Sequence, residues 1–337
     1  MHIINGKTAK FVQILYHSSM KYGYLLLLTA LLLISCSRDR YIALNGYAQG
    51  GTYTVKMNLK GVSIDQNSIQ MAVDSILTQV DNTLSGYNKS SVLSRYNEGQ
   101  DVLLNPMFVD ILELSERLKE ETGGAFDVGA APLFDIWGFG FTRDSLPDPM
   151  RIQEAIAQNG KKLNFNAIAQ GYTCDVVASY LKGIGVQDML VDIGEIYCQG
   201  LNPSRRNWTI GIDSPIDGNE NPGEMLQGIF QCSEEPQGIV TSGNYRKYYL
   251  QDGRKYAHTI DPKTGYPVQH HILSATVLAK DCATADAYAT SFMVMGLRRA
   301  KKVLARHPEL MAYFICSDRQ GRNIVWYSPS LKEKIAE

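Results

Sequence analysis

The sequence predicts an α+β fold with a mostly antiparallel sheet core and packed helices. Helix-type and strand-type stretches are interleaved along the chain without a regular strand–helix–strand repeat, which argues against a doubly wound parallel sheet. Two Tyr-rich runs flank Asp252-Gly253, a pair typical of the two-residue turn of an antiparallel hairpin. The 337 residues are enough for one large or two small domains with a full core.

Residues 1–36 are expected to be a lipoprotein signal peptide. Lys21 precedes an apolar run from Tyr24 to Ile34, and the run leads into Ser35-Cys36, which resembles a lipobox. The run is shorter than the roughly 20 residues that span a bilayer comfortably. A plain transmembrane anchor and a secretory signal with an incidental Cys are the alternatives, and Met20 is an alternative start.

This interpretation fixes the predicted domain organisation and location. Cys36 would become the lipidated N-terminus, residues 37–46 a short tether, and residues 47–337 the folded domain. The protein is then expected to be exported and anchored by lipid to a bacterial membrane, facing the periplasm.

Four helices are predicted from apolar stripes with a 3.6-residue period or from helix end signals. They are the stripe Ile69, Val73, Ile76, Val80 and Leu84; the segment from Asn105-Pro106 to Gly123-Gly124; the segment from Ala167 to near Gly183; and about Ala283 to Met295, before Gly296. Strands are predicted at Tyr53–Met57, Met189–Cys198, Trp208–Ile212, Leu273–Ala279, Ala312–Cys316 and Ile324–Tyr327.

Charge and cysteine usage argue against a nucleic-acid-binding protein, a zinc protein and a disulfide-rich protein. The 33 basic and 34 acidic residues give a formal net charge of −1, and no basic run or nucleic-acid motif is present, so nucleic acid is not an expected partner. Beyond Cys36, the cysteines are scattered without a CxxC pair, which indicates neither a zinc site nor a dense disulfide framework. Buried structural thiols are expected.

Asp286 and Thr290 are candidate metal ligands. They are four residues apart in a predicted helix, so their side chains lie on one face. Carboxylate, hydroxyl and carbonyl oxygens are the hard ligands that Mg²⁺ takes. The alternative is an exposed Asp with a Thr hydroxyl bonded to the carbonyl four residues earlier.

His258 is a candidate general base, because its side chain titrates near neutral pH; a structural His at a strand end is the alternative. Thr241-Ser242-Gly243 is a glycine turn with hydroxyl groups, which can present donors to an anion. Arg246 follows and can add paired phosphate contacts. A plain tight turn between strands is the alternative for this segment.

Several motifs occur together in one order. They are GGAFDV (123–128), PLFDIWGFG (132–140), NAIAQGYTCD (166–175), HTIDPKTGYPV (258–268) and TADAYAT (284–290). Together they resemble the ApbE family of flavin transferases, which move FMN from FAD onto a protein Thr or Ser. The resemblance runs from about Gly50 to Tyr327, and its most specific parts are the last two motifs.

The resemblance implies roles for individual residues. Mg²⁺ would bind Asp286, Thr290 and the Ala167 carbonyl, and His258 would deprotonate the acceptor hydroxyl. FAD would contact Gly50, Tyr87, Ala125, Phe126, Asp127, Asn164, Gln170 and Ile260, together with the turn Thr241, Ser242, Gly243 and Arg246.

Three positions depart from the family pattern. Gln170 replaces a common Lys, Gly50 replaces a Met, and one Gly is missing beside Gly194. Because the missing Gly allows a register slip in the strand, no catalytic role is assigned to Glu195.

The implied partners are FAD, the membrane through the N-terminal lipid, and an acceptor flavoprotein subunit. By resemblance, the acceptor would belong to an Rnf or sodium-pumping NADH:quinone reductase complex. Two alternatives remain: an FAD pyrophosphatase that yields FMN and AMP, and a non-enzymatic FAD-binding lipoprotein.

Overall fold

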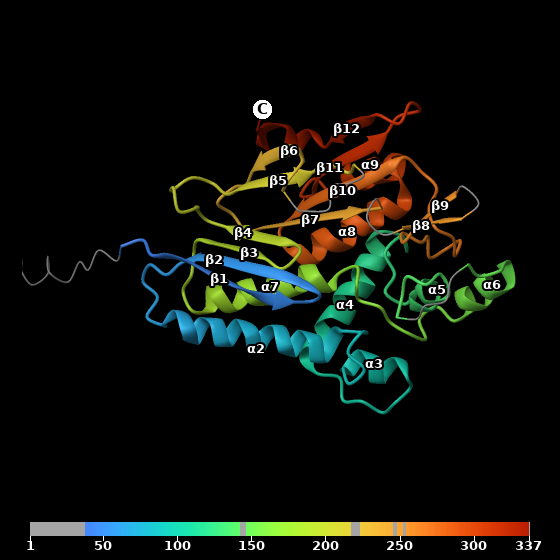
Figure 1. Cartoon of the computed structure of the whole chain (residues 1–337), viewed down its shortest axis with the longest axis horizontal. Coiled ribbons are helices and arrows are strands. Elements are labelled where there is room, and N and C mark those ends of the chain that lie inside the picture. Colours follow the sequence, from blue (N-terminus) through green and yellow to red (C-terminus); the bar gives the residue numbers. More distant parts are fainter. Residues whose placement is uncertain (1–37, 142–145, 217–222, 245–247, 252–253, 337) are drawn as a thin grey trace, which may run out of the picture. The chain divides into compact units, whose positions relative to one another are not determined.

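An eight-stranded sheet forms the centre of the folded unit (Figure 1). Its strands along the chain are β1 (Tyr41–Ala48), β2 (Gly51–Asn58), β3 (Met189–Asp192), β4 (Ile196–Gln199), β7 (Gln237–Gly243), β10 (Ile272–Ala279), β11 (Met311–Ser317) and β12 (Asn323–Tyr327). They are ordered β1-β2-β3-β4-β7-β10-β11-β12, and every neighbouring pair is antiparallel. The predicted α+β class with an antiparallel core is confirmed.

The computed structural model describes residues 38–141, 146–216, 223–244, 248–251 and 254–336. The predictions on Cys36, Arg246 and the Asp252-Gly253 turn therefore lie outside the described residues. The strands on either side of that turn, β8 (Tyr248–Gln251) and β9 (Arg254–Ala257), do pair antiparallel.

Each face of the central sheet is covered by a different layer. Helices α7 (Ala169–Gly183) and α8 (Cys282–Met295) pack on one face and share the larger hydrophobic core with it. The opposite face carries a smaller core beneath a three-stranded sheet of order β13-β6-β5. Its strands are β5 (Thr209–Asp213), β6 (Leu226–Gln231) and β13 (Ile335–Ala336).

The remaining helices lie around these layers (Figure 1). They are α2 (Gln66–Leu84), α3 (Val92–Asn97), α4 (Pro106–Glu121), α5 (Ala131–Ile136), α6 (Pro149–Ala157), α9 (Leu297–Leu304) and the 3₁₀ helix η1 (Pro329–Lys334). Helix α2 buries most of the predicted stripe, with Leu77 buried in place of Ile76. Helix α4 starts as predicted, since the Asn105 side chain accepts the Phe108 N–H.

The structure differs from the predicted elements in two places. The predicted strand Met189–Cys198 is a hairpin, because Gly194 adopts φ 89° and turns the chain between β3 and β4. Residues 41–46, predicted as tether, belong to β1, which pairs along its full length with β2. The folded unit therefore begins at Tyr41.

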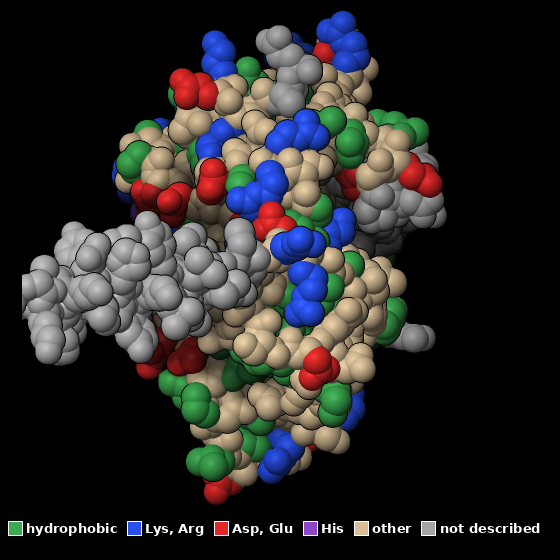
Figure 2. All heavy atoms as spheres, turned by 90° about the vertical axis from the view of Figure 1, so that its left-hand side faces the viewer, with side chains coloured by type: hydrophobic (Ala, Val, Ile, Leu, Met, Phe, Trp, Pro, Cys, Tyr) green, Lys and Arg blue, Asp and Glu red, His purple; other side chains and the backbone are tan. Residues whose placement is uncertain are grey.

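No helix among the described residues is long and apolar enough to cross a bilayer. The five described cysteines are all buried free thiols, as expected. Figure 2 shows Lys and Arg side chains along the middle of one face, with acidic and apolar side chains around them.

Candidate functional site

The N-terminus of α8 is held by two carboxylates. Asp281 caps its own helix by accepting the Thr284 N–H at 2.8 Å. Asp175 of α7 accepts the N–H groups of Cys282 and Ala283 at 2.9 and 2.8 Å. Burial raises the pKa of Asp175 to about 7, although the two N–H bonds oppose this shift. The pair fixes α8 against α7.

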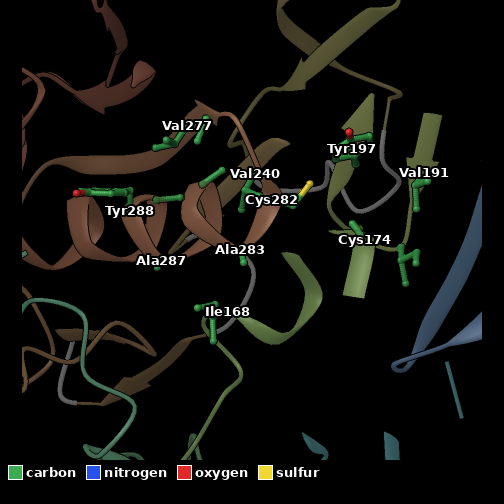
Figure 3. Close-up of a cluster of buried hydrophobic side chains, with 14 of the residues drawn as sticks. Ile168, Cys174, Val191, Tyr197, Val240, Val277, Cys282, Ala283, Ala287 and Tyr288 are labelled. Carbon is green, nitrogen blue, oxygen red and sulfur yellow. The ribbon is translucent and has the colours of Figure 1, made fainter. Parts of the chain in front are cut away.

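Two glycines allow this close packing. A Cβ on Gly171 of α7 would lie 2.4 Å from the Cys282 carbonyl oxygen, and one on Gly238 of β7 would lie 2.3 Å from the Cys282 nitrogen. Figure 3 shows Cys282 and Ala283 at this end of α8. They belong to the same hydrophobic cluster as Ile168, which directly precedes α7, and Cys174, which lies in α7. The start of α8 is thereby enclosed between a helix and a strand.

Asp286 lies one turn into α8 and is 6% exposed. Its Oδ2 accepts the Gly171 N–H at 3.2 Å. Burial raises the pKa of Asp286 to about 7. Because Gly171 donates to this carboxylate, the Ala167 carbonyl four residues earlier accepts no hydrogen bond from the described part of the chain.

Thr290 lies one turn further along α8. Its Oγ1 is 3.2 Å from the Ser242 Oγ of β7. The neighbouring Thr241 bonds Thr276 of β10, with 2.8 Å between the hydroxyl oxygens. The alternative of an exposed Asp with a back-bonded Thr is therefore wrong. The predicted glycine turn at residues 241–243 is also wrong, because these residues are the end of strand β7 and pair with β10.

The residues predicted to bind Mg²⁺ fit a hard cation. Asp286 keeps a second carboxylate oxygen, Thr290 supplies a hydroxyl, and the Ala167 carbonyl has an open lone pair. Asp286 bonds Gly171 at the start of α7, just after Ala167, and Thr290 lies one turn further along α8 beside Ser242 of β7. No group of three or more His, Cys, Asp or Glu suited to a metal occurs among the described residues, so a site here needs such carbonyl and hydroxyl oxygens.

Glu195 is a site residue that sequence reasoning missed. The pairing of β3 with β4 is continuous, so there is no register slip in this hairpin. Glu195 is the last residue of the turn between the two strands. Its Oε2 accepts the Thr241 N–H at 3.3 Å. Burial, and next the neighbouring Asp286, raise the pKa of Glu195. The sequence did contain a signal for Glu195, because an acidic residue follows a glycine directly after a buried strand.

Tyr87, Asn164 and Gln170 lie around the segment that leads into α7. Tyr87 is 65% exposed and its hydroxyl accepts a hydrogen bond from the Asn166 side chain at 3.3 Å. Asn164 is buried, and its side chain accepts the Asn166 N–H. The Gln170 side chain packs on Gly194, where a Cβ would lie 2.6 Å from Nε2. An exposed Tyr ring here suits stacking on a planar ligand.

The predicted FAD-binding stretch 125–127 presents little side-chain surface. Ala125 and Phe126 are buried in the larger core. The Asp127 carboxylate already accepts the Gly129 N–H and the Asn159 side chain, each at 2.9 Å, and pairs with Lys119 at 3.0 Å. A ligand contact from this stretch would therefore come mainly from its backbone.

His258 lies just after β9, beside residues of the PLFDIWGFG segment. Its ring is 6.3 Å from the Phe139 ring, and the nearby Ile260 is 1% exposed. Residues 261–265 form a turn in which the Gly265 N–H donates to the Asp261 carbonyl at 2.8 Å. The Trp137 indole N–H donates to the Gly265 carbonyl at 2.8 Å, which joins the PLFDIWGFG segment to this turn.

The last predicted FAD contact, Gly50, is at the tip of the β1–β2 hairpin. Gln49 and Gly50 form its two-residue loop with φ 51° and 81°. No described group lies within 4 Å of a Cβ built on Gly50. The hairpin tip is held to α7 by a hydrogen bond from the Gln49 side chain to Thr173 at 2.5 Å.

Comparison with known proteins gives one consistent result. The ApbE family model matches residues 49–314. The FAD:protein FMN transferase of Haemophilus influenzae is 32% identical over 345 residues, covering 94% of this chain and 97% of that protein. That of Vibrio cholerae is 33% identical over 301 residues, covering 82% and 88%.

Solved structures agree with the sequence relatives. The flavin transferase ApbE from Vibrio cholerae superposes with a TM-score of 0.77 at 31% identity, covering 88% of this chain and 100% of that one. The apo flavinyl transferase ApbE from Pseudomonas stutzeri gives a TM-score of 0.77 at 31% identity, covering 88% and 97%. On the matched fold and on a family model that spans most of its length, this protein belongs to the ApbE family.

Proposed function

We propose that this protein transfers FMN from FAD to a Thr or Ser hydroxyl of a target flavoprotein, releasing AMP, in a reaction that requires Mg²⁺. The transfer itself is the activity named for its relatives. The observation that supports the finer proposal is that Asp286 bonds the start of α7 beside the Ala167 carbonyl, one helical turn from Thr290.

Asp286, Thr290 and the Ala167 carbonyl would hold the cation. Mg²⁺ held there would supply positive charge to the pyrophosphate of FAD. The Gly171 N–H orients the Asp286 carboxylate, and the Ser242 hydroxyl orients the Thr290 hydroxyl. Tyr87 offers an exposed ring for stacking, and Gln170 offers hydrogen bonds but no charge.

His258 would accept the proton of the acceptor hydroxyl. The hydroxyl oxygen then forms a bond to the FMN phosphorus while the pyrophosphate P–O bond to AMP breaks. The products are AMP and a protein with FMN joined through a phosphoester. The Phe139 ring, against which the imidazole lies, limits where the His258 side chain can point.

The acceptor would be a flavoprotein subunit of the Rnf or sodium-pumping NADH:quinone reductase type, at the same membrane surface. Lipid on Cys36 would keep the enzyme there. Since the folded unit begins at Tyr41, residues 37–40 allow a reach of about 14 Å from the lipidated residue.

The proposal is tested by incubating the purified full-length protein with FAD, Mg²⁺ and such an acceptor subunit, followed by intact-protein mass spectrometry of the acceptor. We expect an FMN-sized mass gain that is lost with EDTA and with Asp286→Ala. Conversion of FAD to FMN and AMP without a mass gain would instead assign a pyrophosphatase. Intact FAD with this acceptor would contradict the proposed transfer.

A further inference from the structure

Glu195 is joined to the candidate metal residues from the strand side. Its carboxylate accepts the Thr241 N–H at 3.3 Å, at the end of β7. The next residue of that strand, Ser242, contacts the Thr290 hydroxyl at 3.2 Å. The residue that Glu195 holds and the residue that contacts Thr290 are therefore adjacent in β7.

Glu195 is also fixed from the helix side. Its carbonyl oxygen accepts the Cys174 thiol at 3.1 Å. Cys174 lies one turn after Gly171 in α7, and Gly171 donates to Asp286. The turn that carries Glu195 is thus attached to the same two elements, α7 and β7, that position Asp286 and Thr290.

The two carboxylates lack a positive partner. Glu195 and Asp286 are both hydrogen-bonded to the same turn of α7, Glu195 through Cys174 and Asp286 through Gly171, and no Lys, Arg or His of the described residues pairs with either carboxylate. Repulsion between neighbouring carboxylates is strong where solvent is largely excluded. A divalent cation bound at Asp286 would relieve it.

We propose that Glu195 is a positioning residue that strengthens divalent-cation binding at Asp286, Thr290 and the Ala167 carbonyl through its negative charge. This inference rests on the proposed function, because it assumes that the cation binds there. Glu195 does not bind the cation itself. It acts through its charge and through its hydrogen bond to Thr241, and it takes no part in proton transfer.

Glu195→Gln separates charge from shape. The amide oxygen still accepts the Thr241 N–H, and the side chain keeps its volume. The variant loses only the negative charge beside Asp286. A charge role and a purely structural role therefore predict different results for the metal-free protein.

The matched control is Asp192→Asn. Asp192 lies in the same hairpin, where its carboxylate accepts the Gly194 N–H at 3.2 Å, and an Asn can keep this bond. Burial raises the pKa of Asp192, and Asp286 does not contribute to that shift. Its substitution removes a charge of the same sign at a position less coupled to the cation.

The experiment titrates the full-length protein with Mn²⁺ at about pH 8 and follows free Mn²⁺ by electron paramagnetic resonance. Glu195→Gln should weaken Mn²⁺ binding about 10-fold. Its metal-free melting temperature should equal or exceed that of the wild type, because repulsion is removed. Asp192→Asn should change the affinity less than about 2-fold.

Equal Mn²⁺ affinity of Glu195→Gln and wild type would overturn the inference and leave the metal site intact. A weaker affinity together with a lower metal-free melting temperature would also overturn it, in favour of a structural role. Absence of Mn²⁺ binding to the wild type would overturn the proposed metal site itself, and with it this inference.

Discussion

At the scale of single residues, the site contains carboxylates, Asp286 and Asp175, that form no ion pair with a Lys, Arg or His of the described residues. Asp286 and Asp175 both have pKa values raised to about 7, and in both burial is the largest cause. The spacing to Thr290 made Asp286 a candidate metal ligand, and the family resemblance assigned it that role. It did not predict Glu195, because that residue reaches the site through contacts that are distant in sequence.

Divalent-cation binding should depend on pH through Asp286. Its folded-state pKa is raised, so the protonated form stabilises the metal-free fold at low pH and this contribution is lost as the pH rises through about 7. Mg²⁺ needs the ionised carboxylate. The Mg²⁺-induced rise in melting temperature should therefore grow between about pH 5 and about pH 8.

The measurement compares melting temperatures with Mg²⁺ and with EDTA across that range. Asp286→Asn is the control, and it should remove both the rise and its pH dependence. A Mg²⁺ effect in the wild type that stays constant over the whole range would contradict this role of Asp286.

His258→Ala should lower the rate of FMN transfer about 100-fold or more, the usual contribution of a general base. FAD binding, followed by flavin fluorescence, should stay within about 2-fold, because the imidazole is proposed to act on the acceptor. His271→Ala is the matched control, since His271 is exposed and close in sequence. Near wild-type transfer by His258→Ala would remove His258 from the mechanism.

At the scale of elements, the site depends on how closely α7 approaches α8. The sequence predicted both helices, because Gly183 and Gly296 lie at or next to their ends and α8 is rich in small residues. It did not predict that Gly171 and Gly238 enclose the start of α8, since glycine serves many purposes and only the packed structure shows which backbone approaches it.

The strand predictions were wrong in two places for a similar reason, because strand reversal and strand pairing depend on the packed structure. The strand-like stretch from Met189 to Cys198 predicts one strand, but not its reversal at Gly194. Residues 41–46 of β1, predicted as tether, are mostly exposed or half-buried, so their apolar pattern is weak. The partner strand β2 had the stronger pattern, and pairing with β2 orders both.

Gly171→Ala should destabilise the protein by about 1–3 kcal/mol, because the new methyl group meets the Cys282 carbonyl. It should also weaken cation binding, since the Gly171 N–H would move from Asp286. Denaturant unfolding and a Mn²⁺ titration measure the two effects. The matched control is Gly183→Ala at the end of the same helix, where a Cβ has open space.

Gly183→Ala should leave Mn²⁺ binding unchanged and stabilise the fold by up to about 1 kcal/mol. If Gly171→Ala were as stable as Gly183→Ala and bound Mn²⁺ as tightly as the wild type, the close contact would have no role in the site.

At the scale of the whole molecule, the central sheet carries different cores on its two faces. The candidate metal residues belong to the α7–α8 side, and the β13-β6-β5 sheet covers the other. The sequence predicted the fold class and many of the elements, but not this division, because periodicity does not say which face of a buried strand meets which layer.

Membrane attachment should depend on Cys36. Cys36→Ser should shift the protein from the membrane fraction to the soluble fraction and abolish labelling by a radioactive fatty acid, because one lipid-bearing residue is proposed as the anchor. Cys316→Ser, at a buried thiol, is the control and should keep both properties. Continued membrane association of Cys36→Ser would favour a transmembrane anchor instead.

The most direct test of the central claim is the ratio of AMP released to FMN attached. The full-length protein, FAD, Mg²⁺ and the acceptor subunit are incubated, AMP is quantified by chromatography, and attached FMN is quantified by mass spectrometry of the acceptor. Transfer predicts one AMP for each FMN attached, with AMP release dependent on the acceptor. AMP release that is equally fast without acceptor, with no FMN attached, would contradict the account.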